Sequence, residues 1–251
     1  TITLWQPFCF CKNAVFYYAI STKKEGKKLK ILSIDTASNL CTVAVLENKK
    51  CIKEIIVNDA RNHSEKIMPV IEQALSESKL TLQDINLIVC DKGPGSFTGI
   101  RIGVGTVLAF KDSLNIPCVG ISSLESLAYN IDSDGIICSL IDAKNNNVYF
   151  GVFEKKNNIV TQLEELSFKT IKEIIPILKK YDKINFVGDG SIIHKEYLLS
   201  NLNTCTFSDK NDLSSFSLGL AGLNAYNQNT NFDLMPLYLR KSQAERALEN
   251  K

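Results

Sequence analysis

The sequence predicts an α/β fold built from two lobes that repeat one order of elements. Short runs of β-branched and apolar residues alternate with helical patterns along the chain. From residue 29 the order is βββαβα, and the same order starts again near residue 136 without obvious residue identity. Alternating strands and helices favour a sheet with parallel members. The doubled βββαβα unit therefore indicates the two lobes of an actin-like ATPase (ASKHA) fold.

The first lobe is expected to span residues 29–132. Three strand patterns open it, joined by the turn residues Ser38-Asn39 and Asn48-Lys49. A long helix, a buried strand, a second long helix, a short strand and a third helix follow. The predicted strands are 31–35, 41–47, 50–57, 85–90 and 117–120, and the predicted helices are 64–78, 98–114 and one that begins near residue 122.

The second lobe is expected to span residues 133–251. Its boundary is taken from the turn sequence Asp132-Ser133-Asp134-Gly135, since no low-complexity linker separates the lobes. Three strand patterns again come first, and a helix, a strand and a helix follow. The predicted strands are 136–142, 148–153, 159–167 and 184–187, and the predicted helices are 170–180 and about 191–201.

The composition is that of an ordinary soluble protein with a substantial core. Hydrophobic residues make up 45% of the chain and charged residues 22%. No C-x-x-C is present and the two histidines are far apart in sequence, so a zinc site is not expected. Five of the eight cysteines lie in strand-like apolar runs, which predicts buried, reduced thiols and a cytoplasmic location. These cysteines are Cys41, Cys51, Cys90, Cys118 and Cys138.

Residues 1–28 differ from the rest, and we expect them to be translated upstream sequence that is disordered or non-native. Their apolar part precedes the lysines, which reverses the order of a signal peptide, and Pro7 and Lys12 interrupt any membrane span. The codons for Lys24-Glu25-Gly26 can spell a ribosome-binding site ahead of a UUG start at Leu29. The segment carries a net charge of +4 against +2 for the whole chain. The remaining −2 removes the support for a basic nucleic-acid surface.

Residues 91–103 contain four glycines between an apolar strand and a long helix. Such a turn can hold a phosphate at a helix N-terminus, which Thr98 is placed to cap. It matches neither standard phosphate motif, because the chain has no Gly-Lys-Ser/Thr of a P-loop and Gly93, Gly95 and Gly99 are spaced one residue too widely for G-x-G-x-x-G. We interpret it as a strand-to-helix turn whose glycines supply unusual backbone angles.

Two helical patterns predict a surface for another subunit. Apolar residues in the helix after residue 63 form an arc broader than one sheet face needs. Small residues four positions apart in the helix at 98–114 allow another helix to approach, and close packing must offset the cost of about 1 kcal/mol per helical glycine. The alternative is that both faces only build the core. The candidate interface residues are His63, Ile67, Met68, Ile71, Leu75, Gly99, Ile102, Gly103 and Thr106.

Other polar residues have both a catalytic and a structural interpretation. Asp35 and Thr36 end the first strand, where actin-like ATPases place a phosphate-and-magnesium loop, but no glycine follows and a capping role is favoured. His63 has no neighbouring nucleophile pattern, so we expect it to cap a helix or lie in an interface. Asp91 and Asp142 end strands and are candidates for an acidic pair, although nothing in the sequence brings them together.

The chain resembles the TsaB (YeaZ) family over essentially all of residues 29–251. The resemblance rests on the motifs ILSIDTA, HSE, GPGSFTGIRIG and PLYLR, at residues 31–37, 63–65, 93–103 and 236–240. The long glycine motif is highly specific, whereas no physical role for PLYLR follows from the sequence beyond a strand-like tail as one option. The family opens with a methionine, a lysine and an apolar strand. Leu29-Lys30 occupies that position, which agrees with a start at Leu29.

The resemblance implies a role in forming threonylcarbamoyladenosine in tRNAs that read codons starting with A. It implies that the chain is a non-catalytic dimerisation partner of the catalytic subunit TsaD, with the ATPase TsaE joining the pair and tRNA reached through the complex. Pairing is implied through the N-terminal lobe, with TsaD or, for the isolated chain, in a homodimer. The resemblance implies no cofactor on this chain alone, ATP and metal on the partner subunits, and no membrane contact.

TsaD-type subunits carry a metal-binding His-x-x-x-His on the helix after the equivalent of Ile121. Ser123 and Leu127 stand at the two histidine positions here, and neither holds a transition metal as an imidazole does. The resemblance thus argues against independent catalysis and for a degenerate nucleotide site at Asp35 and Thr36. The alternative function is an actin-like enzyme, either a small-molecule kinase or ATPase or a metallopeptidase.

Overall fold

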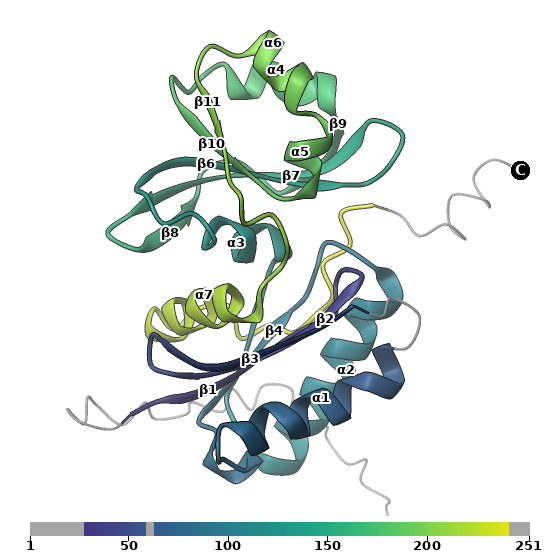
Figure 1. Ribbon diagram of the computed structural model, residues 1–251, viewed down its shortest axis with the longest axis vertical. Coiled ribbons are helices and arrows are strands. Elements are labelled where there is room, and N and C mark those ends of the chain that lie inside the picture. The colour runs from purple at the N-terminus through teal and green to yellow at the C-terminus, as the bar shows by residue number, and fades with distance from the viewer. Residues whose placement is uncertain (1–27, 59–62, 241–251) are drawn as a thin grey trace, which may run out of the picture.

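A computed structural model describes residues 28–58 and 63–240 of the protein. The expectation for residues 1–28 therefore lies, apart from Lys28, outside the described residues. Figure 1 shows two lobes, each built on one β-sheet, with the first lobe below the second. Helices lie on both faces of each sheet, so the central strands read as continuous apolar runs rather than as alternating ones.

The first sheet has the strand order β3-β2-β1-β4-β5. Its first three strands are antiparallel neighbours, while β4 and β5 run parallel to β1. The parallel members follow from the helices that connect them, since a parallel pair needs a crossover connection. The strands are β1 (Lys30–Asp35), β2 (Leu40–Glu47), β3 (Lys50–Asn58), β4 (Leu87–Asp91) and β5 (Cys118–Ile121).

The second sheet repeats this arrangement, with the order β11-β10-β6-β7-β8 and β9 also paired to β7. The predicted duplication of βββαβα is therefore confirmed. The single strand predicted at 159–167 is two strands, because the backbone N–H groups of Leu163 and Glu164 both turn to the Val152 carbonyl and interrupt the ladder. The strands are β6 (Gly135–Asp142), β7 (Asn147–Lys156), β8 (Ile159–Gln162), β9 (Ser167–Thr170), β10 (Ile184–Val187) and β11 (Cys205–Phe207).

Among the described residues, three α-helices lie in the predicted first lobe and four in the predicted second lobe, and the last of these was not indicated by the sequence. The helix predicted at 191–201 is two short helices that meet at His194. Neither β11 nor α7 was predicted. The helices are α1 (His63–Glu77), α2 (Phe97–Leu114), α3 (Ser123–Ala128), α4 (Ile171–Leu178), α5 (Asp189–Ile193), α6 (Lys195–Asn201), α7 (Ser215–Asn227) and the 3-10 turn η1 (Leu82–Asp84).

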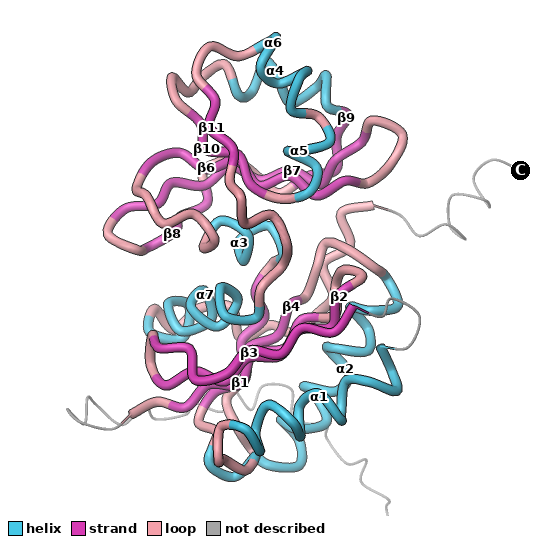
Figure 2. Tube along the Cα trace, in the orientation of Figure 1, coloured by secondary structure: helices cyan, strands magenta, loops and turns pink. Residues whose placement is uncertain are grey.

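The two helices that close the repeats, α3 and α7, exchange lobes. Helix α3 packs on β6 and β7 of the second sheet, and α7 packs on β1, β2, β4 and β5 of the first. They contact each other, and Figure 2 shows both between the two sheets. A boundary between residues 132 and 133 therefore puts α3 in the first lobe although it covers the second sheet. It likewise puts α7 in the second lobe although it covers the first sheet.

Helix α7 lies close to the first sheet because its sequence carries glycines on the buried side. A Cβ on Gly222 would overlap the Val89 side chain, and one on Gly219 would meet Leu46. Its N-terminus is held by Glu54 of β3, whose Oε1 accepts hydrogen bonds from the Ser214 hydroxyl at 2.8 Å and the Phe216 backbone N–H at 3.0 Å. A carboxylate at a helix N-terminus is stabilising. These contacts fix the second half of the chain onto the first lobe.

The six described cysteines carry free thiols, and Cys41, Cys90, Cys118 and Cys138 are buried as predicted. Cys51 is half-buried instead, because β3 lies at the edge of the first sheet. Burial raises the pKa of Cys41 to about 11 and that of Cys118 to about 12. Such thiols stay protonated and unreactive at neutral pH.

Candidate functional site

The glycine-rich turn at residues 91–99 packs directly on the loop that follows β1. Gly93 adopts a φ of 98°, and Ser96, rather than the predicted Thr98, is the N-cap of α2, its hydroxyl accepting the Gly99 N–H at 3.2 Å. A Cβ on Gly95 would overlap the Ala37 carbonyl. The interpretation of a strand-to-helix turn is therefore correct, and its glycines permit close approach to the β1 loop.

Asp35 and Thr36, the predicted phosphate-loop position, lie beneath this turn. Both are 1% exposed, and Ala37 is 3% exposed. The Thr36 hydroxyl donates to the Gly99 carbonyl at 2.7 Å, and the Ser96 N–H donates to the Ala37 carbonyl at 2.7 Å. The Thr36 hydroxyl and the Ser96 N–H are thus engaged in hydrogen bonds inside the chain, where α2 packs on the β1 loop.

The partner of Asp91 is Asp35 and not Asp142, the candidate that the strand ends suggested. The parallel register aligns Ile34 with Cys90, so the next residue of each strand meets at the same edge of the sheet. Asp91 is also 1% exposed, and this register places the two aspartates next to each other on neighbouring strands. The structure therefore places an acidic pair in the interior of the first lobe.

The environment of this pair favours the protonated forms. Burial and the neighbouring charge of Asp91 raise the pKa of Asp35 well above its usual value. Burial raises the pKa of Asp91 to about 6, against hydrogen bonds from the Gly93 N–H at 2.6 Å and the Ser123 hydroxyl at 2.7 Å. Two adjacent buried carboxyl groups do not both ionise readily.

Ser123 and Leu127 on α3 occupy the positions that the resemblance relates to metal-binding histidines. Ser123 is fully buried, and its hydroxyl donates a hydrogen bond to Asp91. Leu127 is 1% exposed, and its side chain lies against Gly188 of the second lobe. Within residues 28–58 and 63–240, no three His, Cys, Asp or Glu side chains are grouped to hold a metal ion. The residues at this place fit packing and hydrogen bonding rather than metal ligation.

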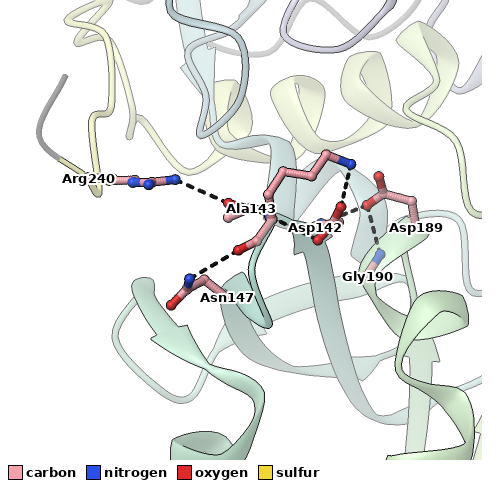
Figure 3. A network of polar contacts seen from close by, with 7 residues as sticks. Asp142, Ala143, Asn147, Asp189, Gly190 and Arg240 are labelled. Atoms are coloured by element: carbon pink, nitrogen blue, oxygen red, sulfur yellow. Dashed lines mark hydrogen bonds and ion pairs between the residues drawn. The ribbon is translucent and has the colours of Figure 1, made fainter. Parts of the chain in front are cut away.

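Asp142 and Asp189 form a second acidic arrangement, at the equivalent edge of the second sheet. Figure 3 shows Asp189 accepting from the backbone N–H groups of Asp142 and Gly190, at 2.9 and 2.7 Å. The Asp142 carboxylate forms an ion pair with Lys144 at 2.6 Å. Burial raises the pKa of Asp189, while the two N–H donors lower it. The Asp189 carboxylate thus holds the turn at 188–191 in place through these hydrogen bonds.

The predicted interface residues divide into a buried set and a partly exposed set. Met68 is 40% exposed on α1, and Ile102 and Thr106 on α2 are half-buried. The other six are buried within this chain: His63, Ile67, Ile71, Leu75, Gly99 and Gly103.

The buried apolar residues of α1 pack on the chain's own sheet, as the core-only alternative proposed. The two glycines also have a role different from the expected one. A Cβ on Gly99 would overlap the Thr36 carbonyl oxygen, and one on Gly103 would lie 2.5 Å from the Thr36 hydroxyl. They bring α2 against the β1 loop, and they do not form a free face for another helix.

His63 begins α1 and is 5% exposed. Its Nε2 lies 3.0 Å from the carbonyl oxygen of Ser38, so this nitrogen carries the proton and donates it. His63 therefore joins the start of α1 to the loop after β1. This contact fits the structural role expected for His63 and leaves its interface role a prediction.

The segment around PLYLR ties the two lobes together. The Leu237 N–H donates to the Lys92 carbonyl at 2.7 Å, and the Tyr238 ring stacks on Phe97 with centroids 4.7 Å apart. Arg240 then donates to the carbonyl oxygen of Ala143 in the second lobe at 3.1 Å (Figure 3). Its guanidinium also lies over the Phe168 ring. The tail is thus ordered against the body, with residues of the motif in contact with both lobes.

Two surface hollows lie along the second lobe. One, of about 270 Å³, is lined by residues 130–133 and 206–210 with Asn185, and the other, of about 470 Å³, by residues 133–136 and 180–183 with Asn185. Neither is lined by Asp35 or Thr36. No described helix is long and apolar enough to cross a membrane.

Comparison with known proteins identifies the family. Residues 50–248 match the family described as "TsaD: tRNA N6-adenosine threonylcarbamoyltransferase". The chain is 35% identical to the tRNA threonylcarbamoyladenosine biosynthesis protein TsaB of Bacillus subtilis over 179 residues, which cover 70% of this chain and 78% of that protein. It is 27% identical to the TsaB of Haemophilus influenzae over 233 residues, which cover 85% of this chain and 94% of that protein.

Solved structures show the same fold. "YeaZ from Pseudomonas aeruginosa" superposes with a TM-score of 0.69 at 20% identity, covering 84% of this chain and 100% of that one. A second Pseudomonas aeruginosa structure, described as similar to peptidase YeaZ, gives a TM-score of 0.73 at 21% identity with the same coverage. The two sheets of this chain share one strand order, as the predicted two-lobe duplication requires. The chain belongs to the TsaB (YeaZ) family of tRNA threonylcarbamoyladenosine biosynthesis proteins.

Proposed function

We propose that the chain is a non-catalytic scaffold that pairs with a TsaD-type catalytic subunit, with a TsaE-type ATPase joining them, during threonylcarbamoyladenosine formation on tRNA. Its relatives named TsaB support the pathway. The match to the family described under TsaD supports a partner of the same fold. In this proposal ATP and metal are bound by the partner subunits, and tRNA is contacted through the complex.

The covered phosphate-loop position is the observation that carries the non-catalytic part. A nucleotide phosphate binds backbone N–H groups that glycines leave accessible. Here the Ala37 N–H donates to the Asp35 carboxylate at 2.7 Å, and the Ser96 N–H donates to the Ala37 carbonyl at 2.7 Å. Opening this position requires α2 to leave the β1 loop, which breaks these contacts and exposes two buried carboxyl groups.

The exposed side of α1 and α2 is the surface that we propose for the partner. Met68 on α1 is 40% exposed and Leu108 on α2 is 38% exposed, and α2 also carries the exposed small residues Gly105 and Ala109. A Cβ on Gly105 would meet open space, so this part of the helix allows close approach. We propose that the same surface joins two copies of the chain when no TsaD-type subunit is present.

Charge substitutions on this surface test the pairing. Met68→Glu and Leu108→Glu place a carboxylate in the proposed contact without touching the core, and each should strongly reduce co-purification of a TsaD-type subunit. Leu199→Glu is the matched control, because Leu199 is 50% exposed on α6 of the other lobe. Gly103→Arg is not suitable, since the added side chain would strike Thr36 within the chain. Undiminished pairing of both α1 and α2 variants would overturn the assignment.

Assays for nucleotide and metal separate the scaffold from the alternative enzyme. Under the proposal the isolated chain turns over no ATP, and added metal neither binds stoichiometrically nor confers peptidase activity. Robust activity of either kind in the purified chain would favour a kinase, an ATPase or a metallopeptidase. A Thr36→Ala variant would identify its source, because activity that depends on the β1 loop should change when this hydroxyl is lost.

A further inference from the structure

The acidic pair at Asp35 and Asp91 has an unusual arrangement of hydrogen bonds. Each carboxyl group has one oxygen that accepts from identified donors, and this oxygen is Oδ1 in both cases. The two Oδ2 atoms are buried, and no donor from the described residues reaches either of them. Because the register of β1 and β4 brings the two residues side by side, each Oδ2 has the other carboxyl group as its available partner.

Two carboxylate oxygens cannot satisfy each other without a proton, since both are acceptors. An unpartnered buried carboxylate oxygen is also costly to remove from water. One proton between the two groups resolves both problems, because a neutral carboxyl group donates one O–H bond to the charged one. No donor from the described residues reaches the two Oδ2 atoms. A single proton bound between them would complete the hydrogen-bond network.

The donors of the two Oδ1 atoms indicate which residue is neutral. Asp91 accepts two hydrogen bonds, from the Gly93 N–H and the Ser123 hydroxyl, whereas Asp35 accepts one, from the Ala37 N–H. Hydrogen bonds to the charged form favour ionisation. Asp91 is therefore the residue that ionises more readily, and Asp35 is the residue that keeps the proton.

We propose that Asp35 and Asp91 bind one structural proton, with neutral Asp35 donating through Oδ2 to the charged Asp91, and that this proton holds the turn at 91–99 on the β1 loop. The two residues connect three segments: the β1 loop through Ala37, the glycine turn through Gly93 and the start of α3 through Ser123. Loss of the proton places two negative charges at the junction of these segments. The proposal does not depend on the proposed scaffold function.

Within residues 28–58 and 63–240, no group that acts on Asp35 offers a counter-charge. The charges that act on Asp35 are those of Asp91 and of Glu54 on β3, and both are negative. The thiols of Cys41 on β2 and Cys90 on β4 are close enough to the pair to be influenced by its charge, and burial raises the pKa of each and holds it neutral. The raised pKa of both carboxyl groups agrees with this environment.

The dependence of stability on pH follows from the sign of these shifts. The folded chain holds a proton on Asp35 at pH values where the unfolded chain, with a pKa near 3.8, has lost it. The resulting stabilisation is present in full below the pKa that Asp35 has in the unfolded chain. It is lost as pH rises toward the pKa that Asp35 has in the folded chain. One excess proton corresponds to a tenfold increase in the unfolding equilibrium constant per pH unit.

The test compares Asp35→Asn and Asp91→Asn with the wild-type full chain by denaturant unfolding from pH 4.5 to 8.5, a range that starts just above the unfolded pKa of 3.8. An asparagine at 35 keeps an N–H donor for Asp91 and has no proton to lose, so this variant should fold and lack the tenfold-per-unit dependence contributed by one proton. Asp91→Asn should be far less stable than Asp35→Asn at pH 7, because it leaves Asp35 as the buried charge. Asp132→Asn is the control, since the Asp132 side chain is 86% exposed.

A second measurement keeps the proposal testable if a variant fails to fold. In the wild-type chain labelled with ¹³C at aspartate carboxyl carbons, the Asp35 carbon should keep the chemical shift of a protonated acid at pH 7. Titration of both carbons at the ordinary value near 4 would overturn the proposal. So would a pH dependence of Asp35→Asn identical to that of the wild type, or equal stability of the two asparagine variants.

Discussion

Gly99→Ala isolates the contact that covers the phosphate-loop position. The added Cβ would overlap the Thr36 carbonyl oxygen, so the first turn of α2 or the β1 loop must move. That movement stretches the 2.7 Å bond from the Thr36 hydroxyl to the Gly99 carbonyl and the 2.7 Å bond from Ser96 to Ala37. The substitution therefore probes the packing between α2 and the β1 loop directly.

The magnitude is a difference of opposing effects. Overpacking costs about 1–3 kcal/mol and a weakened buried hydrogen bond about 1 kcal/mol, whereas alanine gains at most about 1 kcal/mol in helix propensity. The net loss of unfolding free energy is about 1–3 kcal/mol. A chain of this size changes Tm by about 2–4 °C per kcal/mol. Gly99→Ala should thus lower Tm by several degrees.

Gly105→Ala on the same helix is the matched control. Its added Cβ meets open space, so only the gain in helix propensity remains and Tm should rise slightly. Both variants are measured by thermal unfolding followed by circular dichroism. If Gly99→Ala were as stable as Gly105→Ala, the close contact of α2 with the β1 loop would not exist as described.

Three further substitutions test other parts of the structure by denaturant unfolding. Glu54→Ala removes the acceptor at the N-terminus of α7 and should cost about 1–2 kcal/mol, and an unchanged midpoint would contradict this cap. Arg240→Ala removes the contacts with Ala143 and Phe168 and should cost about 1–2 kcal/mol, more than Arg240→Lys costs. Burial raises the pKa of Glu125 from 4.5 to about 7. The contribution of its protonated form to the free energy of unfolding is therefore lost as pH rises through that interval. Glu125→Gln should remove a dependence of about 1.4 kcal/mol per pH unit there, and an identical pH profile would disprove the shift.

Much of the fold was predictable because its signals are local. Most strands of both lobes and helices α1 and α2 carry clear apolar patterns, and the turn at Asn48-Lys49 is marked by an asparagine that adopts a φ of 54°. Helix α7 was missed although Gly219 and Gly222 and the serine cap at 214 are visible in the sequence. Glycines lower helix propensity, and here tertiary packing on the first sheet outweighs that loss.

The candidate site was predictable in its residues but not in their partners. The sequence placed Asp35, Asp91 and Ser123 at the ends of strands or the start of a helix, yet only the parallel register of β1 and β4 brings the two aspartates together. The spacing of Gly99 and Gly103 correctly indicated a close approach. It could not distinguish a partner's helix from the chain's own β1 loop, because both require the same small residues.

Reconstitution of tRNA modification tests the scaffold proposal most directly. Threonylcarbamoyladenosine formation is measured with a TsaD-type subunit, a TsaE-type ATPase and the threonylcarbamoyl-adenylate donor, with and without this chain. The proposal predicts that product forms when the chain is added, that the chain alone gives none, and that Thr36→Ala retains the wild-type rate if it folds. Full modification without the chain, or modification by the chain alone, would contradict it.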